Sequence, residues 1–179
     1  MMKKTLKLML VAILALGLFA CGEKQLTEND MKEAEATLFN EDGSIKTDVA
    51  PKVAETYLKF VEQNPDAPSA PLWLYHAFEV NVMLKNAEQS EVLCNKLVEQ
   101  YPDNEWTPKA LYLLGSFVYE DQLHDLDKAR STYERILADY PDSDLIPSVE
   151  ASIKYLGLTN DEIMTIITMS QMDVEEGEW

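Results

Sequence analysis

Three copies of a Pro-Asp pair, each followed by a second proline six residues after the first, divide this chain at regular intervals. The copies begin at Pro65, Pro102 and Pro141, so that successive copies are 37 and then 39 residues apart. Each copy separates two stretches whose apolar residues have helical spacing. Because proline ends a helix at one position and starts one at another, the pattern predicts helix–turn–helix units. A period of this length indicates stacked repeats.

An apolar stripe with the spacing of a helix precedes each Pro-Asp pair, in the same phase each time. Three sets of residues correspond: Val53, Ser90 and Ala129; Tyr57, Cys94 and Tyr133; Phe60, Leu97 and Ile136. The stripe predicts the second helix of each unit. Cys94 lies on it with leucine and valine neighbours, which favours a buried small hydrophobe over a reactive thiol.

The remaining helices are predicted from caps and breakers. Asn29 or Asp30 is the expected cap of a first helix, and Thr107 is the expected cap of the third unit with Pro108 as its first helical residue. We expect helices at about 49–64, 71–84, 87–101 and 146–156, a long turn at 121–127, and a final helix after a capping box at 159–162. The final helix is expected to cover the last exposed apolar face.

These positions resemble the tetratricopeptide repeat, in which small residues in both helices are followed by an aromatic residue and a proline. The third unit fits best, through Gly115, Ala129, Tyr133, Ile136 and Pro141; the second follows through Ala77, Ser90, Cys94, Leu97 and Pro102. The first unit fits only in its second half. The resemblance covers residues 30–156. It implies an all-α, right-handed helical repeat of about three helix pairs with C-terminal capping helices.

In that family the first helices line a concave surface that holds a peptide or a partner protein. By the family pattern, the exposed groove positions are Leu74, Phe78 and Asn81 in the second unit and Tyr112, Ser116 and Tyr119 in the third. The competing interpretation is that Leu74, Phe78 and Tyr112 pack between repeats.

The N-terminus resembles the signal sequence of a bacterial lipoprotein. Three lysines precede an apolar run of 13 residues, Leu8–Ala20, which is too short to span a bilayer comfortably. The run ends in Ala20-Cys21, and the resemblance implies cleavage before Cys21 and attachment of acyl chains to it. An ordinary secretory signal cut near Ala20, or an N-terminal anchor, is the alternative. We therefore predict a signal peptide at 1–20, a tether at 21–29, a repeat domain at 30–171 and an acidic tail at 172–179.

Lipidation would place the protein in the bacterial cell envelope. The resemblance implies the outer membrane, facing the periplasm, because Gly22 is not the aspartate that signals retention in the inner membrane of some bacteria. The style of the repeats resembles that of the lipoprotein subunit of the outer-membrane β-barrel assembly machinery and of the repeat domain of the Tol–Pal-linked cell-division coordinator.

The chain without its predicted signal peptide is strongly acidic. Without Lys3, Lys4 and Lys7 it keeps 12 basic and 32 acidic residues, a net charge of −20. Such a charge argues against binding nucleic acid.

No motif of catalysis, metal binding or phosphate binding stands out. His76 and His124 lie 48 residues apart, and no glycine-rich phosphate loop or nucleophile elbow is present. We therefore expect that the protein is not an enzyme and has no cofactor. We expect instead a membrane-anchored scaffold that binds another envelope protein or a peptide. Two alternatives stay open: a lipoprotein that captures a small ligand or glycan on Trp73, Trp106 and the tyrosines, and a structural subunit of an envelope assembly.

Overall fold

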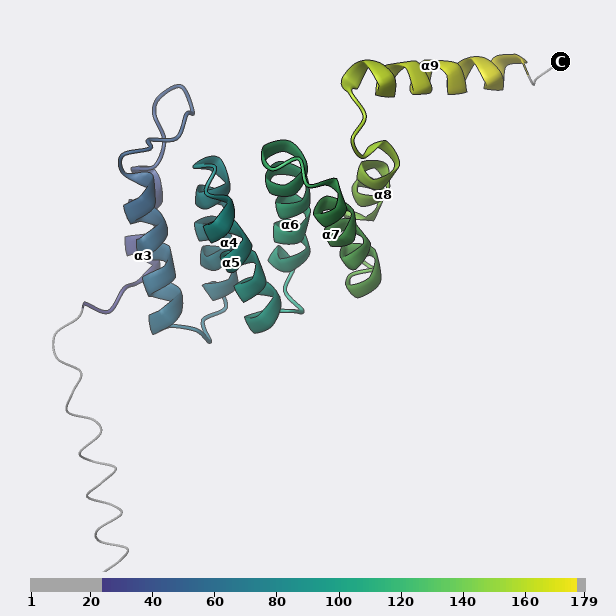
Figure 1. The fold of residues 1–179 in the computed structure, drawn as a ribbon. Coiled ribbons are helices and arrows are strands. Elements are labelled where there is room, and N and C mark those ends of the chain that lie inside the picture. The colour runs from purple at the N-terminus through teal and green to yellow at the C-terminus, as the bar shows by residue number, and fades with distance from the viewer. Residues whose placement is uncertain (1–23, 177–179) are drawn as a thin grey trace, which may run out of the picture.

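The computed structural model describes residues 24–176, which form an array of antiparallel helices (Figure 1). The helices in chain order are α2 (Glu28–Ala36), α3 (Ala50–Gln63), α4 (Ala70–Met83), α5 (Ala87–Gln100), α6 (Trp106–Leu113), the π-helix η1 (Leu114–Gln122), α7 (Leu126–Asp139), α8 (Ile146–Tyr155) and α9 (Asn160–Glu176). The described part contains no strand, only an isolated bridge between Phe39 and Ile45. The predicted all-α fold is confirmed. The predicted signal peptide and Cys21 lie outside the described residues.

The three Pro-Asp copies form the same turn between consecutive units. The residues before the prolines, Asn64, Tyr101 and Tyr140, end helices α3, α5 and α7 with φ of −137°, −135° and −131° and ψ of 55°, 52° and 53°. Each carbonyl accepts the N–H three residues on, at 3.0–3.1 Å. The repeated sequence therefore predicts a repeated backbone geometry, and Tyr101 joins two copies by donating its hydroxyl to the carbonyl of Pro65 at 2.9 Å.

The core runs the length of the array rather than forming one centre. The predicted stripe is buried in all three units, with Tyr57, Cys94 and Tyr133 at most 1% exposed. Helix α4 contacts α3, α5 and α6, which explains why its sequence is apolar nearly all round. Burial of this kind along successive pairs is how stacked repeats are stabilised.

Two predicted helix caps are wrong. Helix α2 begins after Thr27, whose N–H and hydroxyl both donate to Asp30, at 2.8 and 2.6 Å. Helix α6 begins two residues earlier than expected, with Glu105 at the cap position. Thr107 lies inside that helix and does not cap it, and its hydroxyl donates to the carbonyl of Tyr101 at 2.6 Å.

The C-terminal helix α9 extends away from the array instead of covering it (Figure 1). The predicted capping box is present, since Thr159 and Glu162 exchange hydrogen bonds of 2.8 and 3.3 Å. Gly157, with φ of 79°, turns the chain between α8 and α9 as expected. However, Met164 and Met169 are 60% and 62% exposed, so this helix leaves these two large apolar side chains in solvent. Residues 172–176 of the predicted tail continue the helix.

Candidate functional site

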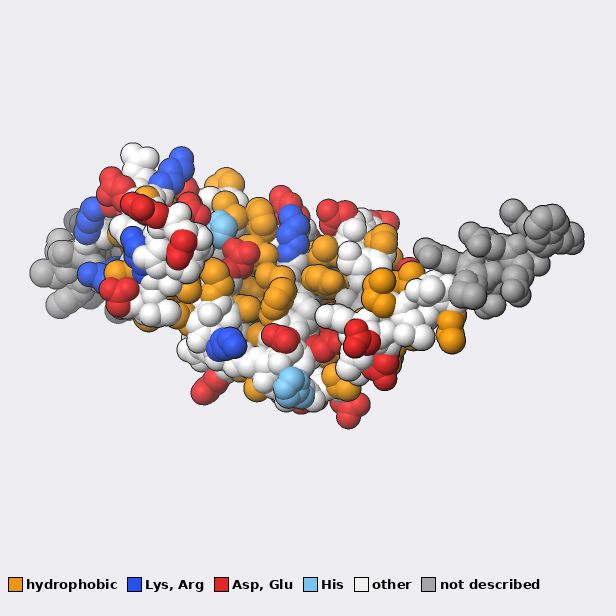
Figure 2. All heavy atoms as spheres, turned by 90° about the horizontal axis from the view of Figure 1, so that it is seen from above, with side chains coloured by type: hydrophobic (Ala, Val, Ile, Leu, Met, Phe, Trp, Pro, Cys, Tyr) orange, Lys and Arg blue, Asp and Glu red, His pale blue; other side chains and the backbone are white. Residues whose placement is uncertain are grey.

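A pocket of about 310 Å³ opens between α4 and η1. Its apolar lining comes from three elements: Val82 and Met83 at the end of α4, Leu113 at the end of α6 and Phe117 in η1. Phe117 is 53% exposed and Met83 is 42% exposed, whereas Val82 and Leu113 are half-buried. Figure 2 shows hydrophobic side chains gathered over the middle of the face where these helices end. We call this pocket the α4–η1 pocket.

Polar residues surround the apolar centre of the α4–η1 pocket. Glu79, Lys85, Asp121 and Gln122 complete its lining. The side-chain amide of Gln122 donates to the main-chain carbonyl of Lys85 at 2.7 Å, so the ends of α4 and η1 are fixed to each other. A carboxylate oxygen of Glu79 lies 2.9 Å from Nδ1 of His76 and accepts a hydrogen bond in the tautomer that carries its proton there. An apolar centre within a polar border is typical of a binding site.

The same turn follows both helices that form the pocket. Lys85 and His124 adopt left-handed backbone conformations, with φ of 56° and 54°. The next residues, Asn86 and Asp125, cap α5 and α7 by accepting N–H groups from Gln89 and Lys128 at 3.3 and 3.0 Å. The predicted long turn at 121–127 is therefore wrong. The connection is as short as in the second unit.

The π-helix η1 takes up the two residues by which the third unit exceeds the second. The N–H after α4, that of Leu84, bonds four residues back, whereas that of Leu123 after η1 bonds five residues back, to Val118. Since each π turn holds more residues than an α turn, side chains beyond Leu114 are rotated about the helix axis. The rotation explains why Phe117 and Asp121 line the pocket and Tyr119 does not.

The groove residues predicted in the second unit do not face solvent. Leu74 and Phe78 are fully buried and Asn81 is 7% exposed, because α4 has neighbours on most sides. The side-chain amide of Asn81 donates to the carbonyl of Ala77 at 2.8 Å, so this side chain is bonded to its own helix. For Leu74 and Phe78 the alternative that they pack between repeats is correct. The exposed side of α4 instead carries His76, Glu79 and Met83.

The predicted residues of the third unit divide between two sides of the array. Tyr112 is half-buried on the side that faces α8, where its hydroxyl lies 3.3 Å from that of Ser152, and the half-buried Ser116 donates its hydroxyl to the carbonyl of Tyr112 at 2.9 Å. Tyr119 is 5% exposed and lies 5.0 Å below the Lys128 ammonium of α7. Burial, followed by the charge of Glu91 in α5, raises the pKa of Tyr119. Tyr119 therefore packs inward, and sequence reasoning missed Phe117 and Asp121 in its place.

Trp73 and Trp106, the two tryptophans of the glycan alternative, are in contact with other residues of the array. Trp73 is 4% exposed and donates its indole N–H to Glu28 at 3.0 Å. The ring of Trp106 lies 5.0 Å from that of Tyr75, and the ammonium of Lys109 lies 4.2 Å over it. Its burial leaves Trp73 no open face on which a sugar ring can stack, and the Trp106 ring is already in contact with Tyr75 and Lys109, which weakens the support for the glycan alternative.

Cys94 is a core residue, as predicted. Its side chain is fully buried, and burial raises the pKa of the thiol to about 12 despite the opposing charge of Arg135.

Over the described part of the chain, no group of His, Cys, Asp or Glu side chains is arranged to hold a metal ion. Within the same residues, no helix combines the length and apolar character needed to span a bilayer.

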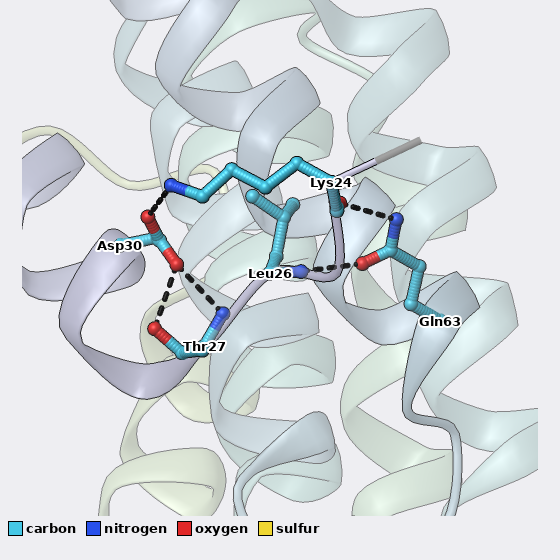
Figure 3. Close-up of polar contacts among 5 residues, drawn as sticks. All are labelled: Lys24, Leu26, Thr27, Asp30 and Gln63. Carbon is cyan, nitrogen blue, oxygen red and sulfur yellow. Dashed lines mark hydrogen bonds and ion pairs between the residues drawn. The ribbon is translucent and has the colours of Figure 1, made fainter. Parts of the chain in front are cut away.

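The N-terminal segment is bound to the end of α3 (Figure 3). The side-chain amide of Gln63 accepts the N–H of Leu26 at 2.7 Å and donates to the carbonyl of Lys24 at 3.2 Å. The Lys24 ammonium pairs with Asp30, which with the Thr27 hydrogen bonds lowers the pKa of Asp30 to about 2. Residues 24–27 of the predicted flexible tether are therefore held against the array.

Comparison with known proteins identifies the repeat in one place. A family profile for the tetratricopeptide repeat matches residues 109–143, which hold most of α6, η1, α7 and the turn after them. No curated protein matches the chain. Together with the helix pairs described above, the match shows an all-α, tetratricopeptide-like repeat fold. Repeats of this kind are typically non-catalytic scaffolds for protein–protein interaction, and the matched segment supplies one wall of the α4–η1 pocket.

Proposed function

We propose that this protein is a lipid-anchored scaffold of the bacterial cell envelope that holds a partner protein or peptide at the α4–η1 pocket. The observation that carries the proposal is the exposure of Phe117 and Met83 on facing helices. Full burial of a large apolar side chain contributes roughly 1.5–3 kcal/mol, and a partner that covers these two half-exposed side chains recovers part of that for each. Clustered exposed apolar groups with a polar border are typical of interaction sites.

A position-specific crosslink in living cells tests the partner. A photoreactive phenylalanine is placed at position 117, and for control at position 92 on α5, because Val92 is also 53% exposed. We expect one discrete adduct from position 117 and none from position 92. Met83→Ser, across the pocket, should weaken the adduct from position 117. Adducts of equal yield from both positions, or from position 92 alone, would contradict a partner held at this pocket.

The envelope location rests on the sequence. The basic start, the apolar run Leu8–Ala20 and the Ala20-Cys21 pair support cleavage before Cys21 and lipidation there. Gly22 supports the outer membrane, facing the periplasm. Mass analysis of the mature N-terminal peptide should find acyl chains on Cys21 and none in a Cys21→Ser variant. An unmodified N-terminus, or cleavage at another residue, would overturn the anchor without touching the proposal about the pocket.

A further inference from the structure

We infer that the α4–η1 pocket selects a partner segment in which an apolar side chain is followed closely by a lysine or arginine. The apolar side chain enters between Met83 and Phe117, and the cation meets the carboxylates of Glu79 and Asp121. The inference rests on the proposed function and names the chemistry of the partner at the same site.

The size and lining of the pocket set the apolar half of the motif. A volume of about 310 Å³ accommodates one large side chain of the partner with part of a neighbour, not a long stretch of chain. Met83 lines one wall, and its flexible thioether adapts to side chains of different shape. Phe117 lines the other wall and offers an exposed ring. A leucine, methionine or aromatic residue fits these walls.

The charges around the pocket determine the second part of the motif, the lysine or arginine. Among the described residues that line it, Glu79 and Asp121 are acidic and Lys85 is basic, and Glu79 also contacts Nδ1 of His76 at 2.9 Å. Asp121 is exposed, and the chain as a whole carries a net charge of −17. Lys109, in α6 on the same side, is bound to Glu105 at 2.8 Å and lies over Trp106, so that its charge is largely compensated. The field at the border therefore favours a cation and disfavours a second copy of this acidic chain.

The secondary structure decides how a segment is recognised. Residues 24–176 contain helices and no sheet, so they offer a partner no sheet edge to which a strand could be added. Main-chain groups of α4 and η1 are already paired within their helices, and Gln122 closes the gap at Lys85. Recognition therefore depends on the side chains of the partner, and both the apolar and the basic one contribute.

Three labelled peptides of identical length and leucine pattern test the inference, with Lys, Gln or Glu at every polar position. Binding to the purified protein is measured by fluorescence anisotropy at two salt concentrations. We expect the Lys peptide to bind roughly tenfold more tightly than the Gln peptide, and the Glu peptide to bind most weakly. Added salt should reduce the preference, because the border charges are exposed.

Matched variants separate the pocket from general attraction to an acidic protein. Asp121→Lys should weaken the Lys peptide roughly tenfold, while Glu134→Lys, which changes the net charge equally at an exposed position on α7, should have less than about a twofold effect. Phe117→Ser should weaken both the Lys and the Gln peptide, and Val92→Ser neither.

Each other outcome overturns the inference in a distinguishable way. If the Lys and Gln peptides bind alike and both depend on Phe117, the pocket binds partners without charge selection, and the proposed function stands. If Asp121→Lys and Glu134→Lys act equally, the preference belongs to the whole chain and not to this pocket. If no peptide binds, the inferred motif is wrong, and the crosslink from position 117 still decides the proposed function.

Discussion

The second helix pair (α4 and α5) and the third (α6, η1 and α7) share their turns but differ in the helix that leads into them. Both turns have a left-handed middle residue and an Asn or Asp cap, at nearly equal dihedral angles. The third pair has two more residues before its turn and accommodates them as a π-helix. A repeat array can thus change the residues on its surface while it keeps the turns that set its stacking.

The two pairs also distribute side-chain volume differently. Counted from the second proline of each Pro-Asp copy and not by the family positions, the seventh residue is Phe78 in the second unit and Gly115 in the third. In the following helix, the corresponding residues are Cys94 and Tyr133. A Cβ built on Gly115 would lie 2.7 Å from Cε1 of Tyr133, so the glycine leaves the space that the ring fills. Large and small residues have exchanged helices, and all four remain buried.

Removal of the ring in the third pair should have the largest effect on stability. Tyr133 is fully buried and its hydroxyl donates to Glu120 at 3.0 Å. Tyr133→Ala should lower the free energy of unfolding by about 3–5 kcal/mol, measured by urea denaturation. Cys94→Ala, at the corresponding position of the second pair, should cost well under half of that. Equal losses would show that the two pairs do not divide volume as described.

Addition of one methyl group to Gly115 tests the same contact from the other side. Gly→Ala within a helix normally stabilises it by up to about 1 kcal/mol. Here the sign should reverse, and Gly115→Ala should destabilise by about 1–3 kcal/mol because the Tyr133 ring must move. In a Tyr133→Ala background the cost should vanish. A cost that persists there would place its origin in the π-helix backbone instead of the ring.

The difference in unfolding free energy between the wild type and Cys94→Ala should change with alkaline pH. The folded pKa of about 12 lies above the ordinary value of 9.0, so between these values the unfolded chain releases the thiol proton and the folded chain keeps it. The contribution of this thiol is therefore present below pH 9 and lost as the pH rises, by up to about 1.4 kcal/mol per pH unit. The difference in unfolding free energy between the wild type and Cys94→Ala should follow that slope. A difference independent of pH from 8 to 11 would contradict it.

The shared turns predict equal effects from their caps. Asn86→Ala and Asp125→Ala should each cost about 1 kcal/mol, since each removes a hydrogen bond to the first turn of a helix. The two values should agree within the error of the measurement. A much larger loss for Asp125→Ala would mean that the π-helix depends on its turn, which would weaken the comparison.

Deletion of residues 160–179 should have the smallest effect. Helix α9 leaves Met164 and Met169 exposed and does not continue the packing of α7 and α8 (Figure 1). We expect a change of less than about 0.5 kcal/mol in the unfolding free energy of the array. A clear loss would indicate that α9 caps the array in solution after all.

Much of the fold follows from local patterns in the sequence. Pro-Asp turns and apolar stripes predict the bounds of α3, α4 and α5 within one residue. The buried positions Tyr57, Cys94 and Tyr133 follow from helical spacing as well. Helix caps were predicted less well. Thr27 is a cap and bonds to the carboxylate of Asp30, whereas Thr107 is not a cap and bonds to the carbonyl of Tyr101. The sequence does not specify which of these acceptors lies near each threonine.

The candidate site could not be predicted in the same way. Family positions pointed to Leu74 and Phe78, yet contact with neighbouring helices buries them. The difference between spacings of 37 and 39 residues was visible in the sequence, but a longer turn and a widened helix satisfy it equally.

The sequence by itself determined the number and order of the helix pairs, the geometry of the turns between them and the buried stripe, because these depend on backbone preferences and local periodicity. Only the tertiary structure decided where the two extra residues went. With the turn after η1 fixed by Asp125 and the ring of Tyr133 packed on Gly115, the surplus was taken up within the helix. The resulting rotation buried Tyr119 and brought Phe117 and Asp121 to the pocket, which no local pattern encodes.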